Sequence, residues 1–160
     1  MTMRQVSVFT ALVAVISLVA TSVAAQDFSF RPFSDVTNVC PTCEAPASDV
    51  LELRNGNEVR ATVVAINPSF YTVVRFGEVR TVPTGDVQNV KWEKGSQPGG
   101  LDNLDQIVLK NGHVLTGSIV VNNETPAYYQ IKSSYMEYTY TVFKSQAAKV
   151  FEKGKAKASN

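Results

Sequence analysis

Apolar and polar residues alternate along most of the chain after residue 48, with the two-residue period of β-strands. Val, Ile, Thr, Tyr and Phe dominate these stretches, and Gly, Pro, Asn and Asp separate them. Beyond the N-terminal stretch, only residues 84–87 and 144–148 are compatible with a single helical turn. The pattern therefore predicts an all-β protein.

The strand pattern occurs twice. Residues 49–56 read DVLELRNG and residues 105–112 read DQIVLKNG, and the copies close on WEKG (92–95) and FEKG (151–154). Agreement at both ends indicates an internal duplication, with a few residues inserted in the middle of the second copy. Each copy is close to the lower size limit for a domain that folds alone, so we expect the two copies to pack together.

The Asn-Gly pair in each copy predicts a hairpin turn and fixes the strand register. A two-residue turn would place apolar and charged side chains on one face of the hairpin. A three-residue loop with a left-handed glycine instead pairs Leu51 with Val59, and Ile107 with Leu115, and keeps one face apolar in both copies. We therefore predict bulged turns, whose structural residues are Asn55, Gly56, Asn111 and Gly112.

Small residues stand at equivalent points of the long second strand, Ala61 in the first copy and Gly117 in the second. They predict a sharp bend that lets each sheet fold over itself. Together with the Asn-Gly turns, Gly117-x-Ile119 and the exit at Val82-Pro83, this pattern resembles SH3-like barrels of the Sm-like type. The resemblance implies two tandem five-stranded barrels, and it implies fold alone, because the basic loop residues with which Sm-like proteins bind RNA have no counterpart here.

The N-terminal residues resemble a secretory signal peptide. Arg4 precedes an apolar segment at residues 9–20, and small residues lead to a predicted cleavage after Ala24 or Ala25. An uncleaved anchor is the alternative, but the apolar segment is short for a membrane span. We expect a periplasmic or secreted mature protein with no membrane span. Its predicted divisions are a signal peptide at 1–25, an N-terminal arm at 26–48, repeats at 49–95 and 105–152, a linker at 96–104, and a basic tail at 153–160.

The charge balance argues against a nucleic-acid partner. Fifteen Lys and Arg residues face fourteen Asp and Glu residues, for a net charge of +1, and Arg4 leaves with the signal peptide. The neutral mature chain lacks the excess positive charge on which nucleic-acid binding relies.

Cys40 and Cys43 form the motif most suggestive of chemistry, Cys-Pro-Thr-Cys. Haem attachment needs a histidine where Glu44 stands, and a structural zinc site normally needs four ligands, which two cysteines and one histidine do not supply. Catalytic thiol exchange usually places the first cysteine at a helix N-terminus. We expect a local Cys40–Cys43 disulfide in an oxidising compartment, with an intermolecular disulfide or thiol exchange as alternatives.

The remaining chemistry-bearing residues predict no catalytic site. His113 is the single histidine and follows a hairpin turn, the carboxylates are scattered over the strands, and no phosphate-binding loop is present. We predict no enzymatic activity, no cofactor and no bound metal.

Tyrosines are dense in the second copy, and they suit either a protein-binding surface or cross-strand packing. The candidate binding residues are Tyr128, Tyr129, Tyr138 and Tyr140. The sequence thus predicts a non-enzymatic interaction or assembly module of the cell envelope with an unknown protein partner. Exposed strand edges leave homo-oligomers open. The alternative is an exported thiol-exchange or metal-handling protein that uses Cys40 and Cys43.

Overall fold

A computed structural model describes residues 28–34 and 48–157, which form two antiparallel sheets with short 3-10 turns between strands. The first repeat forms a sheet in the order β4-β3-β2-β1-β5. Its elements are β1 (Asp49–Leu53), β2 (Glu58–Ile66), β3 (Phe70–Arg75), β4 (Glu78–Pro83), the 3-10 turn η1 (Thr84–Asp86) and β5 (Val87–Lys91).

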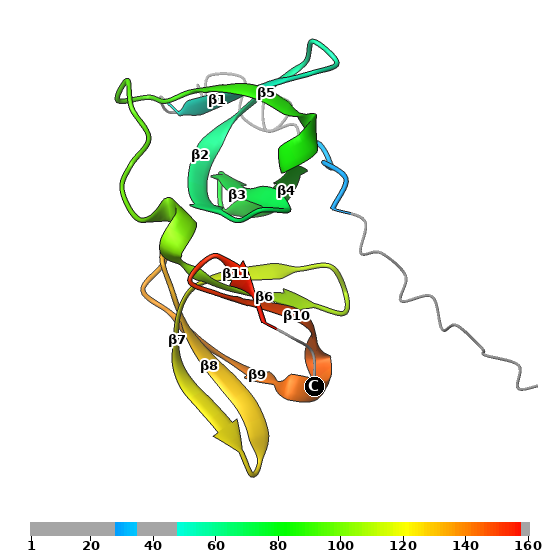
Figure 1. Ribbon diagram of the computed structural model, residues 1–160, viewed down its shortest axis with the longest axis vertical. Helices are drawn as coiled ribbons and strands as arrows, with labels where there is room; N and C mark the ends of the chain where they lie inside the picture. Colours follow the sequence, from blue (N-terminus) through cyan, green and yellow to red (C-terminus); the bar gives the residue numbers. More distant parts are fainter. Residues whose placement is uncertain (1–27, 35–47, 158–160) are drawn as a thin grey trace, which may run out of the picture.

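The second repeat follows the 3-10 turn η2 (Leu101–Asn103) and forms a sheet in the order β11-β10-β6-β7-β8-β9. Figure 1 shows it stacked below the first sheet. Its elements are β6 (Asp105–Leu109), β7 (Val114–Glu124), β8 (Ala127–Ser133), β9 (Thr139–Phe143), the 3-10 turn η3 (Lys144–Gln146), β10 (Ala147–Glu152) and β11 (Lys155–Ala156). The all-β prediction is confirmed, and η1 and η3 are the two expected helical turns.

The prediction of two closed five-stranded barrels is wrong. Strands β4 and β5 are the outer strands of the first sheet and do not pair with each other. The chain crosses between these edges through η1, directly after Pro83, which has no backbone N–H to donate. The second sheet is likewise open, and β11 gives it a sixth strand.

The predicted hairpin register is the observed one. Leu51 pairs with Val59, and Ile107 pairs with Leu115. Gly56 and Gly112 adopt left-handed backbone conformations, with φ of 84° and 85°. The side-chain oxygens of Asn55 and Asn111 accept the backbone N–H two residues ahead, at 3.0 and 3.1 Å. This register keeps one face of each sheet apolar, and that face forms the core of each repeat.

Gly117 allows β7 and β8 to approach closely where β7 bends. A Cβ atom at this position would lie 1.8 Å from the backbone oxygen of Lys132 and 2.7 Å from its carbonyl carbon. Just beyond, the pairing of β7 with β8 shifts register between Ile119 and Val121. The glycine is therefore needed for steric reasons, and not for an unusual φ.

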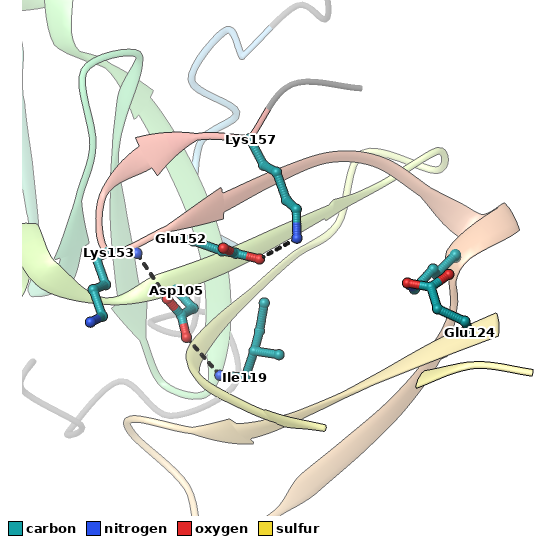
Figure 2. Close-up of polar contacts among 7 residues, drawn as sticks. Asp105, Ile119, Glu124, Glu152, Lys153 and Lys157 are labelled. Atoms are coloured by element: carbon teal, nitrogen blue, oxygen red, sulfur yellow. Dashed lines mark hydrogen bonds and ion pairs between the residues drawn. The ribbon is translucent and has the colours of Figure 1, made fainter. Parts of the chain in front are cut away.

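One aspartate in each repeat joins the bent strand to the end of the last strand. Figure 2 shows that Asp105 accepts hydrogen bonds from the backbone N–H of Ile119 at 2.7 Å and of Lys153 at 2.8 Å. Asp49 accepts the equivalent bonds from Val63 at 2.9 Å and Glu93 at 3.0 Å. The first residue of the repeated sequence motif thus has the same structural role in both copies.

The end of the repeat departs from the sequence alignment by one residue. Lys91 pairs with Val50, whereas Phe151 pairs with Gln106, so Phe151 is equivalent to Lys91 and not to Trp92. A shift by one residue moves a side chain to the opposite face of a sheet. Trp92 packs on the core of its own repeat, whereas Phe151 packs between the two repeats.

The first residues of the predicted basic tail belong to the second sheet. Lys155 pairs with Glu152 across the β10–β11 hairpin, and the backbone N–H of Lys157 donates to Val150 at 2.8 Å. The Lys157 ammonium lies 2.7 Å from Glu152 (Figure 2), which raises the pKa of that lysine. Residues 153–157 are therefore paired backbone, although the lysines remain exposed.

The two repeats pack together, as their size predicts. Phe70, Val108, Val114 and Phe151 form a buried apolar cluster between them, and the Phe70 and Phe151 rings lie 5.7 Å apart. Beside this cluster the amide of Gln106, which is fully buried, bridges the repeats. It accepts a hydrogen bond from Asn67 at 2.6 Å and donates one to the Thr72 hydroxyl at 2.7 Å.

Candidate functional site

Residues 28–34 lie against the first repeat, at the side where β4 forms the edge of the sheet (Figure 1, blue). Phe30 and Phe33 pack on the apolar core of that repeat. The backbone N–H of Ser34 donates to Glu78 at 3.1 Å, and the Arg80 guanidinium lies 5.7 Å from the centre of the Phe33 ring. Hydrogen bonds from Ser34 lower the pKa of Glu78, and the charge of Arg80 adds to this effect. These aromatic residues therefore dock, as their composition allows.

The equivalent positions of the second repeat carry the tyrosine pair. Val82 and Val142 are both buried and lie two residues before η1 and η3, which aligns β4 with β9. Glu78 is then equivalent to Tyr138, and Arg80 is equivalent to Tyr140. The two positions that hold residues 28–34 on the first repeat are thus occupied by tyrosines on the second.

Tyr138 and Tyr140 form an exposed aromatic surface. Their rings lie 4.7 Å apart at an interplanar angle of 68°, and Tyr138 is 59% exposed. Tyr140 is half-buried and packs on the core of the second repeat. Burial raises the pKa of the adjacent Tyr135, and Tyr140 contributes to the rise. The alternation Tyr-Thr-Tyr places both rings on one face, as the sequence indicates.

The other two candidate tyrosines have different surroundings. Tyr129 is buried in the core of the second repeat, with the Lys144 ammonium 5.1 Å from its ring centre. Tyr128 is half-buried and pairs across the sheet with Phe143. Cross-strand packing therefore accounts for Tyr129, and only Tyr138 is largely open to a partner.

Strand β9 is the outer strand beside these tyrosines. The backbone N–H of Ser133 donates to the carbonyl oxygen of Tyr138 at 2.9 Å. In an antiparallel pair, residues alternate between facing the partner strand with their backbone groups and facing away from it. The backbone N–H and C=O groups of Thr139 and Thr141 therefore point away from β8. The next outward N–H, of Phe143, donates to the side chain of Gln146 at 3.2 Å. The exposed edge thus offers backbone donors and acceptors beside exposed aromatic rings.

The other outer strands of the described ranges are protected in ways that β9 is not. Residues 28–34 contact β4, β5 carries Lys91 in an ion pair with Glu52 at 2.5 Å, and β11 has two residues, of which one is a lysine. Strand β9 reads TYTVF, without charge or proline, and its Phe143 is 53% exposed. Charges, short strands and covering segments are the usual means of preventing strand pairing at an edge.

A pocket of about 470 Å³ adjoins Tyr140, where the two repeats meet. Val114 and Leu115 contribute apolar surface to it, and its basic side chains are Arg31, Arg80 and His113. No carboxylate occurs among the described residues that line it. Sequence reasoning did not find this pocket, because its walls come from distant parts of the chain: residues 28–34, β4 and the turn before it, the β6–β7 and β8–β9 loops, and the strands β7 and β9.

The structure places the remaining candidates as follows. His113 lies exposed after the β6–β7 turn, and Cys40 and Cys43 lie outside the described residues. Within residues 28–34 and 48–157, no three His, Cys, Asp or Glu side chains come together in a way that could hold a metal ion. In the same ranges, no helix is long and apolar enough to cross a membrane.

Comparison with known protein families and with characterised proteins found no match to this sequence. The β9 surface is therefore the feature of the molecule from which a function can be inferred.

Proposed function

We propose that this chain is an exported protein of the cell envelope, periplasmic or secreted, built from tandem SH3-like repeats of the Sm-like type. Its role is to bind another protein or to assemble with one, without catalysis. The partner binds along β9, beside Tyr138 and Phe143. The N-terminal signal-like sequence supports export, and the strand order and bulged turns support the SH3-like assignment.

The single observation that carries this proposal is the unprotected edge of β9 with its exposed aromatic side chains. An extended segment that pairs with such an edge gains main-chain hydrogen bonds, and neighbouring apolar side chains give specificity. Aromatic residues are also enriched in protein interfaces. The other outer strands within residues 28–34 and 48–157 are protected, so among these strands the open edge is a feature of β9.

Site-specific photo-crosslinking in cells of the native host tests the proposal. A benzoylphenylalanine at position 143 should give a discrete adduct, which Thr141→Lys should remove because a charge on the edge opposes strand pairing. The same photo-reactive residue at position 76 is the control, since Phe76 is also exposed, at 46%, but lies in the first repeat. Identical adducts at both positions, or an adduct that survives Thr141→Lys, would show that the edge is not the binding site.

A further inference from the structure

We propose that the partner segment bound at β9 is an extended, phenylalanine-rich stretch that resembles the chain's own residues 28–34. This inference rests on the proposed function and adds the chemistry of the partner. It follows from the internal duplication, because one repeat already holds such a segment at the equivalent surface.

The first repeat shows what kind of segment this surface accepts. Residues 28–34 form no strand, yet Phe30 and Phe33 pack on the core with their rings 6.1 Å apart. Two side chains hold the segment at β4, Glu78 through the Ser34 N–H and Arg80 over the Phe33 ring. The surface thus takes aromatic residues from an extended backbone.

The second repeat has the same surface without a segment on it among the described residues. Tyr138 replaces Glu78, and its hydroxyl can accept a backbone N–H as the carboxylate does. Tyr140 replaces Arg80, and a tyrosine ring can stack edge-to-face with another aromatic ring such as phenylalanine; the Tyr138–Tyr140 pair has this edge-to-face geometry. Both replacements keep the capacity to hold a phenylalanine-rich segment and remove the charges.

The pocket beside Tyr140 adds a preference for an acidic residue in that segment. Its basic side chains, Arg31, Arg80 and His113, face no carboxylate among the described lining residues. Glu78 already neutralises part of the Arg80 charge, through an ion pair of 2.7 Å, whereas Arg31 takes part in no ion pair within the described ranges. A carboxylate next to the aromatic residues of the partner therefore complements this pocket, and a second arginine does not.

The test is an NMR titration of the full mature chain with synthetic peptides. The probe is the acetylated and amidated peptide of residues 28–34 with Arg31→Asp; the matched controls are the unchanged peptide and the same probe with Phe30 and Phe33 replaced by alanine. We expect shifts at Thr139 to Thr141 with the probe, weaker binding of the unchanged peptide, and none of the alanine peptide. Tyr138→Ala should weaken binding about tenfold, the equivalent of about 1.4 kcal/mol, whereas Phe76→Ala should not.

Three results would overturn the inference: no shifts with the probe, equal binding of the alanine peptide, or shifts confined to Glu78 and Arg80. The last result would mean that the peptide only displaces residues 28–34 from the first repeat. Failure of the peptide while the position-143 crosslink persists would reject the partner chemistry and leave the interaction function standing. Loss of both signals would reject both proposals.

Discussion

Replacement of Gly117 by alanine tests the closest backbone contact of the fold. The added methyl group would lie 1.8 Å from the Lys132 oxygen, which is backbone and cannot swing aside. Strands β7 and β8 would have to separate at the point where the second sheet bends. Overpacking of this kind lowers the free energy of unfolding by about 1–3 kcal/mol. Alanine also has less conformational entropy than glycine in the unfolded chain, which offsets about 0.4–1 kcal/mol of this loss.

We therefore expect Gly117→Ala to lower the free energy of unfolding by about 1–2 kcal/mol, and the urea midpoint by about 0.5–1 M. Gly85→Ala is the matched control, because a methyl group there meets no atom within 4 Å. Its stability should stay within about 0.5 kcal/mol of wild type. Equal stability of the two variants would refute the close approach of β7 to β8.

The same experiment tests whether the repeats unfold together. Trp92 is the single tryptophan and packs in the first repeat, whereas Gly117 lies in the second. Because Phe70 and Gln106 join the repeats through buried contacts, the Trp92 fluorescence transition should move together with the circular-dichroism transition of the whole chain. A Trp92 midpoint unaffected by Gly117→Ala would show that the interface does not couple the two repeats.

Three further predictions concern the interface, the aspartate bridges and the docked segment. Phe70→Ala should lower the free energy of unfolding by about 3–5 kcal/mol in urea denaturation, because it empties the cluster between the repeats; a loss under 1 kcal/mol would contradict the buried contact. Asp105→Asn should cost about 1–3 kcal/mol in the same assay, because Oδ1 and Oδ2 of Asp105 each accept one N–H and asparagine leaves one of these N–H groups facing its own NH2 group; an unchanged midpoint would argue against the bridge. The pKa of Glu78 is lowered from 4.5 by Ser34, so the Ser34 contact should persist above that pH and be lost as the pH falls through the lowered value; an NMR pH titration should show the Ser34 amide moving with a midpoint below 4.5, and a movement of equal size in Glu78→Gln would contradict the contact.

The strand register could be predicted because a single alternative satisfied both copies. Only the bulged turn keeps Leu51 and Val59 on one apolar face in the first repeat while it does the same for Ile107 and Leu115 in the second. Two copies of a sequence are two tests of one register. The glycine at position 117 was also informative, because a backbone contact that leaves no room for a Cβ atom requires glycine in the sequence.

The closing motifs of the two copies were misaligned because similar sequences can place corresponding residues on opposite faces of the sheet. The sequences WEKG and FEKG suggest that Trp92 corresponds to Phe151. The pairing of β5 with β1 and of β10 with β6 shows instead that the two residues differ by one position in the sheet. The pocket and the docking of residues 28–34 were also beyond the sequence, since both depend on how the two repeats pack. Closure into barrels was inferred from the bend, but a bend alone does not pair the two outer strands.

The duplication explains why one surface is covered and its counterpart is open. The two repeats keep the residues that shape a sheet, such as the aspartate bridges of Asp49 and Asp105, and differ where they contact other parts of the chain. Gln106 stands where the first copy has Val50, because it faces the other repeat across a buried interface. By the same logic, we propose that the change from Glu78 to Tyr138 marks a change of partner. The first site holds the chain's own segment through a carboxylate, and the second presents an uncharged aromatic surface that no other segment of residues 28–34 and 48–157 covers.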